Sequence, residues 1–257
     1  MEWSFTKYHG AGNDFILIDD RNLTFPAHDV HLIERLCHRH FGIGADGFIL
    51  LQPSDKGDFL MRIFNSDGKE AEMCGNGLRC LVHFAHSLGI IKETYFVETL
   101  ASVMACQLSG ERVTSSFKSS VQKSFDVETH KVHVVNAGVP HAVVFVPTLD
   151  MPDFCEEARK IRFHPLFHPE GVNVNFVVLQ EDGMLSCRTY ERGVEGETLC
   201  CGTGAVAVAI IARNVYQMAS SVKVLPKSQE ILEVDIDDSS IFMTGPVHRV
   251  FAGSFAF

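Results

Sequence analysis

The sequence lacks the features of membrane, secreted and nucleic-acid-binding proteins. No stretch approaches the ~18 uninterrupted apolar residues that a membrane-spanning helix needs. Residues 1–8 contain no basic segment followed by an apolar core, so no secretory signal is visible and we expect a cytoplasmic protein. The net charge of −10, with no run of Lys and Arg, argues against binding to phosphate backbones. We therefore expect neither a membrane nor a nucleic acid among the partners.

Patterns for metal and disulfide-exchange chemistry are also missing. The eight cysteines include no CxxC pair, which disfavours zinc ribbons and thioredoxin-type redox sites. The histidines of residues 38–40 lie in a candidate amphipathic helix without HExxH spacing, so we expect no metal. Four of the cysteines lie among apolar residues, and we expect them to be small core fillers: Cys37, Cys106, Cys155 and Cys187.

The length and apolar content of the chain suit a folded protein with a sizeable core. Its 257 residues allow one large domain or two smaller ones, since a typical domain has ~100–150 residues. The hydrophobic fraction is 46%, which is typical of a globular protein.

Three pairs of short motifs recur at nearly one offset, which indicates an internal repeat. HGAGNDFILID resembles VNAGVPHAVVFV, with Gly12 and Gly138 126 residues apart, and GIGADGFILL resembles GVNVNFVVL at an offset of 128. Cys74 and Cys201, each directly before a Gly-x-Gly, lie 127 residues apart. Three motifs in the same order and register favour two copies of one structural unit.

Both halves contain short β-type runs bounded by Gly, Pro, Asn or Asp. These runs predict the strands FILID, GFILL, FLMRIF, TYFVET, KVHVV, AVVFV, NFVVL, LSCRTY, ILEVDI and SIFMTG. Three helices are expected: one after the cap candidate Asp29, one between Gly77 and Gly89, and one from Gly204 through AVAVAIIA. The last is apolar on all faces, which predicts burial on all sides. The polar, Ser-rich residues 115–124 are expected to contain the link between the halves.

The two Cys-Gly-x-Gly turns, residues 74–77 and 201–204, carry the chemistry that the sequence offers. A helix N-terminus presents unpaired N–H groups and the positive end of the helix dipole, so each turn is suited to a carboxylate or a phosphate. The same field is expected to lower the pKa of the thiol. If the two halves face each other, one thiolate can take a proton from the carbon next to a carboxylate while the other thiol returns a proton to the opposite face.

Other readings of these turns stay open from the residues alone. A single Cys-Gly-x-Gly before a helix is most often just a turn. A redox-sensing, anion-binding protein would use the same turns without catalysis. Phosphate transfer is disfavoured because neither turn has the Lys-Ser/Thr of a P-loop and no acidic metal pair stands out.

The motifs resemble those of the diaminopimelate epimerase family over nearly the whole chain. KYHGAGNDFILID, RIFNSDGKEAEMCGNGLRC, AGVPHAV, GVNVNF, RTYERG, ETLCCGTGA and MTGP occur in the order of that family. The resemblance implies an isomerase that interconverts LL- and meso-2,6-diaminopimelate without pyridoxal phosphate or any other cofactor, in lysine and peptidoglycan synthesis, usually as a homodimer.

The same resemblance completes the expected architecture. It is an α/β (α+β) fold of two pseudo-symmetric halves, each a β-rich, barrel-like sheet wrapped around a central helix. We expect the first half to span residues 1–115, with residues 248–257 returning to it, and the second half to span residues 116–247.

The resemblance also assigns roles residue by residue. Cys74 and Cys201 match the two catalytic bases, and Cys200 is expected only to pack. His141 and Glu191 match residues that pair with the thiols and assist their deprotonation. The substrate-binding matches are Gly75, Asn76, Gly202 and Thr203 for the α-carboxylate, and Asn13, Asn65, Asn173, Arg192 and Glu191 for the distal end.

The chain departs from the family pattern at two places. Val139 stands where the family commonly has Asn, and ERGVEGET has one residue more than usual between Gly193 and Glu197. Both changes fall where specificity for the distal end is set. They raise the hypothesis that a shorter amino acid such as glutamate is also racemised.

Overall fold

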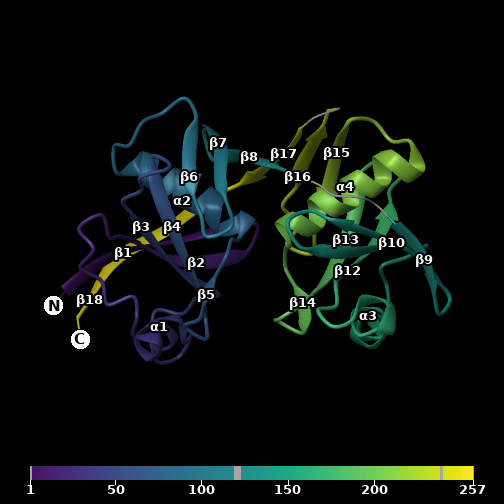
Figure 1. The fold of residues 1–257 in the computed structure, drawn as a ribbon, viewed down its shortest axis with the longest axis horizontal. Coiled ribbons are helices and arrows are strands. Elements are labelled where there is room, and N and C mark those ends of the chain that lie inside the picture. Colours follow the sequence, from purple (N-terminus) through teal and green to yellow (C-terminus); the bar gives the residue numbers. More distant parts are fainter. Residues whose placement is uncertain (1, 119–122, 238–239, 257) are drawn as a thin grey trace. The chain divides into compact units, whose positions relative to one another are not determined.

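The computed structural model describes residues 2–118, 123–237 and 240–256. The chain divides into two compact units, residues 1–115 with 245–257 and residues 116–244 (Figure 1). Each unit is a mixed α/β structure with many strands and few helices. No helix in the described part of the chain is both long and apolar enough to cross a membrane.

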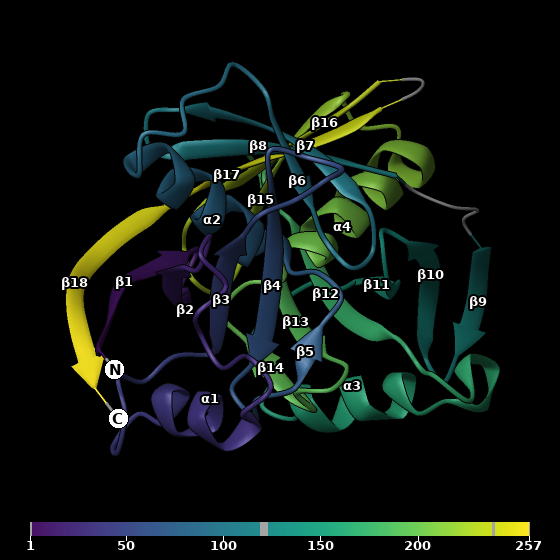
Figure 2. The ribbon, with the colours of Figure 1, turned by 60° about the vertical axis from the view of Figure 1, so that its left-hand side comes forward.

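The first unit is built on a sheet in which the last strand of the chain joins the first. β18 (His248–Ala256) pairs antiparallel with β1 (Glu2–Gly10), as Figure 2 shows, and β1 pairs antiparallel with β2 (Asn13–Asp19). β2 runs parallel to β3 (Gly47–Gln52), which is antiparallel to β4 (Phe59–Asn65). The unit is completed by β5 (Glu70–Ala71), β6 (Tyr95–Glu98), β7 (Val103–Ser109) and the start of β8 (Arg112–Phe117).

The second unit repeats this pairing pattern. β9 (Lys123–Val127) pairs antiparallel with β10 (His130–Asn136), as β18 does with β1. β10 is antiparallel to β11 (Pro140–Phe145), β11 is parallel to β12 (Asn173–Leu179), and β12 is antiparallel to β13 (Leu185–Glu191). The remaining strands are β14 (Gly196–Thr198), β15 (Ser221–Leu225), β16 (Leu232–Ile236) and β17 (Ile241–Pro246). The observed pairings therefore contain the internal repeat that the motifs indicate.

A helix covers each face of the central strands, which explains their continuous apolar sequence. In β2, Phe15 and Leu17 pack with the helix α2 (Gly75–Ser87), whereas Ile16 and Ile18 pack with α1 (Val30–Cys37). Strands buried on both faces lose the alternation of apolar and polar residues. In the second unit α4 (Gly202–Tyr216) is buried all round from Ala205 to Ala212. The central helices α2 and α4 both begin at the Cys-Gly-x-Gly turns.

The predicted elements are largely observed, with corrections. All ten predicted strands and three predicted helices are present, and Asp29 caps α1 by accepting from Leu32 N at 3.0 Å. The helix α3 (Phe154–Arg162) and a short 3₁₀ turn, Pro165–Phe167, were not predicted. Residues 38–40 follow α1 instead of lying within it. Of the predicted link, residues 119–122 lie outside the described residues, and β8 and β9 extend into it from either side.

The prediction that Cys155 fills the core is wrong. Cys155 is exposed on α3, whereas Cys37, Cys106 and Cys187 are buried as predicted. On α3 the inward positions are taken by Phe154, Ala158 and Ile161, which leaves the side chain of residue 155 on the outer face. Cys200 is buried, in agreement with its expected packing role.

Candidate active site

Cys74 stands at the first of the two helix starts. Its backbone is extended, with φ −141° and ψ 120°, and its carbonyl accepts the first helical hydrogen bond, from Leu78 N at 2.8 Å. The N–H groups of the first turn of a helix have no partner within the helix. The turn thus places those N–H groups and a half-buried thiol on one end of α2.

Asn13 connects β2 to this thiol. Its Oδ1 lies 3.7 Å from Cys74 Sγ, a distance at which the thiol can donate to it, and it accepts from Asn76 Nδ2 at 3.2 Å. Asn76 in turn accepts from Arg79 Nη2 at 2.7 Å. The structure therefore brings Asn13 together with Cys74 and Asn76, which follow it by more than sixty residues in the sequence. The resemblance assigns Asn13 to the distal end of the substrate and Asn76 to the α-carboxylate, so this contact was not predicted.

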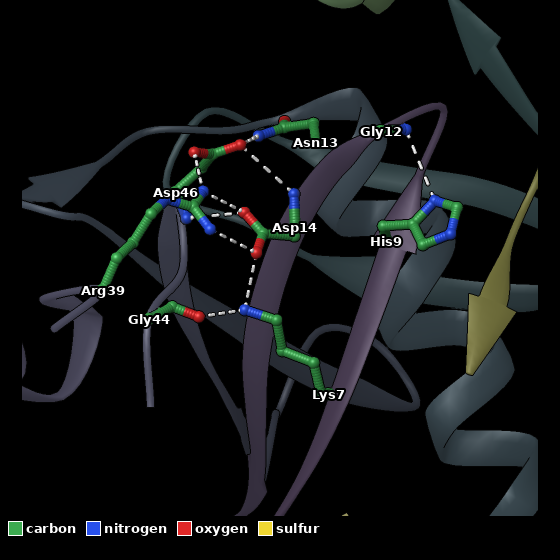
Figure 3. A network of polar contacts seen from close by, with 8 residues as sticks. All are labelled: Lys7, His9, Gly12, Asn13, Asp14, Arg39, Gly44 and Asp46. Atoms are coloured by element: carbon green, nitrogen blue, oxygen red, sulfur yellow. Dashed lines mark hydrogen bonds and ion pairs between the residues drawn. The ribbon is translucent and has the colours of Figure 1, made fainter. Parts of the chain in front are cut away.

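A charged network supports Asn13 from the other side (Figure 3). Asn13 Nδ2 donates to Asp46 Oδ2 at 3.0 Å, and Arg39 Nη2 joins Asp46 to Asp14 at 2.7 Å each. Lys7 Nζ pairs with Asp14 at 2.6 Å and also donates to the carbonyl of Gly44. Burial alone would raise the pKa of Asp14, but the hydrogen bonds from Arg39 and Lys7 lower it to about 2. None of these four charged residues was singled out from the sequence.

The remaining predicted residue of this unit, Asn65, ends β4 and is exposed. Its backbone closes the turn of FNSDG: Asn65 N donates to Lys69 O at 2.9 Å, and Asn65 O accepts from Gly68 N at 2.9 Å. The structure thus assigns it the position of a turn residue beside the strand end.

Cys201 occupies the matching position at the start of α4. Its Sγ lies 3.5 Å from Thr203 Oγ1, and the same hydroxyl lies 2.9 Å from His141 Nε2. Thr203 therefore links the thiol to His141, which comes from the start of β11 and is completely buried. Burial, assisted by the positive charge of Arg192, lowers the pKa of His141 to about 3, so the ring is neutral near pH 7.

Asn175 holds His141 from behind and was missed by the sequence analysis. Its Nδ2 lies 3.1 Å from His141 Nδ1 and donates to Ala142 O at 3.0 Å, while its Oδ1 accepts from Thr189 at 3.0 Å. A signal was present in GVNVNF: Asn173 and Asn175 lie two apart on a strand and so share a face. A fully buried amide on that face must have polar partners.

The predicted acidity of the thiols is wrong for Cys201. Burial raises the pKa of the Cys201 thiol well above its ordinary value, and the nearby carboxylate of Glu191 raises it further. Thr203 and the backbone N–H of Gly204 act in the opposite direction, as a helix N-terminus should. Desolvation outweighs them, so Cys201 is protonated at neutral pH.

The loop after β13 carries the other predicted residues of the second unit. Glu191 Oε1 accepts from Thr198 Oγ1 at 2.6 Å, and Arg192 N donates to Asn173 Oδ1 at 2.8 Å. The structure thus joins Asn173 to the backbone of Arg192, and Asn173 Nδ2 also reaches Pro140 O at 3.4 Å.

The extended loop of ERGVEGET is anchored at Glu195. The carboxylate of Glu195 accepts from Arg162 Nη2 at 2.8 Å and from Gly193 N at 3.0 Å, and Tyr190 OH lies 3.4 Å away. Arg162 comes from α3 and is itself buried. The longer loop is therefore fixed by an ion pair from an element that the sequence analysis did not predict.

The chain is similar along nearly its whole length to a known family of proteins. The profile of the family described as diaminopimelate epimerase matches residues 5–121 and 133–250. The chain is 41% identical over 273 residues to diaminopimelate epimerase of Archaeoglobus fulgidus, covering 98% of this chain and 96% of that protein. It is 44% identical over 268 residues to that of Methanothrix thermoacetophila, covering 97% of this chain and 94% of that protein.

Solved structures share the fold at low identity. A PhzF-family phenazine biosynthesis protein from Bacillus anthracis superposes with a TM-score of 0.79 over 100% of both chains, at 16% identity. A probable proline racemase from Agrobacterium radiobacter gives 0.72 over 99% of this chain and 93% of that chain, at 17% identity. At such identity these likenesses concern the fold alone. The match to the family profile and to its full-length relatives places this chain in the diaminopimelate epimerase family.

Proposed function

We propose that this isomerase interconverts LL- and meso-2,6-diaminopimelate, with Cys74 and Cys201 as the two acid-base groups. The observation that carries the proposal is the duplication: two units of one topology each begin their central helix with a half-buried thiol. Epimerisation needs a base on one face of the α-carbon and an acid on the other. Two equivalent thiols supply one group for each face.

The proposed reaction needs one thiol as a base and the other as an acid. In one direction a thiolate removes the α-proton and the electron pair of the C–H bond passes into the carboxylate. The N–H groups of the helix starts, with Gly75, Asn76, Gly202 and Thr203, would stabilise the charge that develops there. The second thiol then donates its proton to the α-carbon from the opposite face. The raised pKa of Cys201 suits the proton-donating role, and the reverse reaction exchanges the two roles.

His141 supports Cys201 by position more than by storing a proton. A ring with a pKa of about 3 does not hold a proton at neutral pH. It can still fix the hydroxyl of Thr203, and through it the orientation of the Cys201 thiol, because both contacts are within hydrogen-bond distance. Burial favours the thiol form of Cys201 most, and the charge of Glu191 adds to it, so in the absence of substrate Glu191 opposes the deprotonation that the resemblance led us to expect it to assist.

Recognition of the distal end of the substrate is assigned to amide and guanidinium groups. Arg192 can hold a distal carboxylate with two parallel hydrogen bonds, and Glu191 can accept from a distal ammonium. Such a polar set rejects substrates that leave its members unpaired. The remaining residues proposed for this task are Asn13, Asn65 and Asn173.

Proton NMR of LL-diaminopimelate in D₂O tests the proposal directly. With reduced protein, and without pyridoxal phosphate or metal, the α-proton signal should disappear as the meso isomer forms. Cys74→Ala and Cys201→Ala should each abolish this, whereas the matched control Cys155→Ala, which removes an exposed thiol from α3, should keep it. An absence of α-proton exchange in the wild type would contradict the proposal and favour an anion-binding, redox-sensing protein instead.

Broader specificity is a second candidate, favoured by Val139 and the longer loop between Gly193 and Glu197. Val139 removes an amide from the segment before His141, so one group that could grip the distal end is missing. The loop itself is held in place, because Glu195 is anchored by Arg162. Racemisation of L- or D-glutamate or aspartate beside diaminopimelate would support this candidate, and strict selectivity for diaminopimelate would exclude it.

The cellular setting belongs to the same proposal. An epimerase of this kind would act in the cytoplasm, in lysine and peptidoglycan precursor synthesis, and as a homodimer. Light scattering coupled to size-exclusion chromatography measures the mass in solution and tests the dimer directly.

A further inference from the structure

The polar side chains next to Cys74 form one directed chain of hydrogen bonds. Asp46 Oδ2 accepts from Asn13 Nδ2 at 3.0 Å, Asn13 Oδ1 accepts from Asn76 Nδ2 at 3.2 Å, and Asn76 Oδ1 accepts from Arg79 Nη2 at 2.7 Å. Every donor in this chain points toward Asp46. The thiol of Cys74 shares the acceptor Asn13 Oδ1 at 3.7 Å.

The two ends of the chain determine its direction. An ionised carboxylate can only accept hydrogen bonds, and a guanidinium can only donate them. An amide presents an acceptor on one side and a donor on the other, so it can be turned either way by its partners. With Asp46 at one end and Arg79 at the other, only one orientation of Asn13 and Asn76 satisfies every contact. That orientation directs the carbonyl of Asn13 at the sulfur of Cys74.

Both ends are themselves fixed. Asp46 also accepts from Arg39 Nη2 at 2.7 Å and from Asp14 N at 3.3 Å. Arg79 is fully buried and donates a second hydrogen bond to Gly75 O at 3.2 Å, one turn back on α2. In the second unit, the residue 127 positions after Arg79 is the apolar Val206, which cannot donate such a hydrogen bond. There His141 and Asn175 serve the thiol instead.

We infer that Asp46 and Arg79 are positioning residues for Cys74, which act through Asn13 and Asn76 to keep a carbonyl oxygen directed at the thiol. A carbonyl oxygen accepts from S–H and is repelled by a thiolate, whereas an amide N–H would stabilise the thiolate. The pair therefore sets how readily Cys74 ionises before substrate binds. The inference rests on the proposed function only in taking Cys74 as an acid-base group.

The ends are redundant, and this redundancy gives a measurable signature. If Asp46 alone is lost, Arg79 still orients Asn76 and through it Asn13; if Arg79 alone is lost, Asp46 still orients Asn13. Loss of both ends removes both charged anchors of the chain, and we expect the amides to turn only then. The electrostatic effects of removing two charges add, because potentials superpose. The effect of turning the amides is not additive, because the amides turn only when both residues are changed and the resulting shift appears only in the double variant.

The experiment measures alkylation of Cys74 and Cys201 by iodoacetamide as a function of pH, with peptides separated by mass spectrometry. It compares the wild type, Asp46→Leu, Arg79→Met and the double variant, without substrate. Adding the two single-variant shifts to the wild-type midpoint gives the midpoint expected for the double variant without coupling. We expect the measured midpoint of Cys74 to lie about one pH unit below that value, a tenfold change in ionisation, because an N–H then faces the sulfur. The midpoint of Cys201 should show no such non-additivity.

Controls keep the test specific. Asp46→Asn keeps an acceptor for Asn13 and should show no coupling to Arg79→Met. Asp19→Leu removes the bidentate ion pair of Asp19 with Arg21 in the same unit. This variant should also show no coupling to Arg79→Met. If Arg79→Met does not fold, Asn76→Ala interrupts the chain at the same point without changing charge, and it should give the same coupling with Asp46→Leu.

The inference would be overturned if the alkylation midpoint of Cys74 shifted additively in the double variant. It would also be overturned if the midpoint of Cys201 showed the same non-additivity as that of Cys74. The outcome does not depend on epimerase activity. Coupling at Cys74 in a protein that epimerises nothing would support the positioning chain and refute the proposed function, and additive shifts in an active epimerase would do the reverse.

Discussion

Glycine at the third position of each central helix offers a test of how differently the two units are packed. Gly77 and Gly204 lie 127 residues apart and occupy the same place in the repeat. A Cβ at Gly77 would meet Ile49 Cδ1 at 2.9 Å and Ile63 Cδ1 at 3.0 Å, which are the ends of flexible side chains. A Cβ at Gly204 would meet Asn175 Oδ1 at 2.5 Å and Cys201 Cβ at 3.2 Å.

The cost of Gly204→Ala can be worked from these contacts. To reach ordinary contact at 3.4 Å from 2.5 Å, the Asn175 amide must retreat by about 0.9 Å. The amide is fully buried and holds His141, Ala142 and Thr189 at 3.0–3.1 Å, so the shift breaks one or two of these bonds at about 1 kcal/mol each. Overpacking adds about 1–3 kcal/mol, and replacing glycine in a helix returns roughly 0.5–1 kcal/mol. The net loss of stability is about 1–4.5 kcal/mol, with a central value of about 3 kcal/mol.

Gly77→Ala should cost less than about 1 kcal/mol, because isoleucine methyl groups can move and the helix gain offsets the strain. Urea unfolding followed by circular dichroism measures both variants, and Gly196→Ala, whose Cβ would meet nothing within 4 Å, is the matched control. Gly204→Ala should also lower kcat, because Asn175 positions His141. We expect Gly204→Ala to have a lower free energy of unfolding than Gly77→Ala. If it is as stable as Gly77→Ala or more stable, this account of the second turn is refuted.

Three further predictions concern single side chains. The pKa of His141 is lowered from 6.5 to about 3 by burial, so the unfolded chain takes up a proton below pH 6.5 that the folded chain refuses. Its contribution to stability is therefore complete above pH 6.5 and is lost as pH falls toward 3, at up to about 1.4 kcal/mol per pH unit. The urea midpoint of His141→Gln should fall less steeply than that of the wild type between pH 7 and pH 4. Equal slopes of the urea midpoint against pH in the two proteins would contradict this. Thr203→Val removes the hydroxyl between Cys201 and His141 and should lower kcat roughly 10- to 100-fold, whereas Thr203→Ser should stay within about threefold of wild type in the same NMR assay; equal losses would show that the hydroxyl is not what matters. Cys155→Ser should leave the unfolding free energy within about 0.5 kcal/mol of wild type and the epimerisation rate unchanged, because the thiol is exposed; a loss of either would assign Cys155 a role that its position does not explain.

Much of the site could be predicted because its signals are local. Cys-Gly-x-Gly followed by an apolar helical pattern places a thiol at a helix start whatever surrounds it, and the repeat predicts that this happens twice. The contact of Asn13 with Cys74 and Asn76 was not predicted, because it depends on how β2 packs against α2. The family resemblance assigned Asn13 only to the distal end of the substrate.

The rest depends on burial and on distant partners, which local patterns do not encode. Nothing near Cys201 in sequence says that its thiol is desolvated, and that desolvation reverses the expected direction of its pKa shift. Asp46 and Arg39 look like ordinary loop charges until the fold brings them to Asn13. The helix α3 was missed although Phe154, Ala158 and Ile161 have helical spacing, and with it were missed Arg162 and the anchoring of Glu195.

The pairing of β18 with β1 has a consequence for the order in which the chain folds during synthesis. The second unit, residues 116–244, is synthesised before residues 248–256. The edge of β1 that will bind β18 stays open until then, so the unit that is begun first is finished last. An open edge strand can pair with other chains. In a released chain truncated after residue 247, the second unit should therefore be protected from proteolysis and the first unit should be sensitive to it.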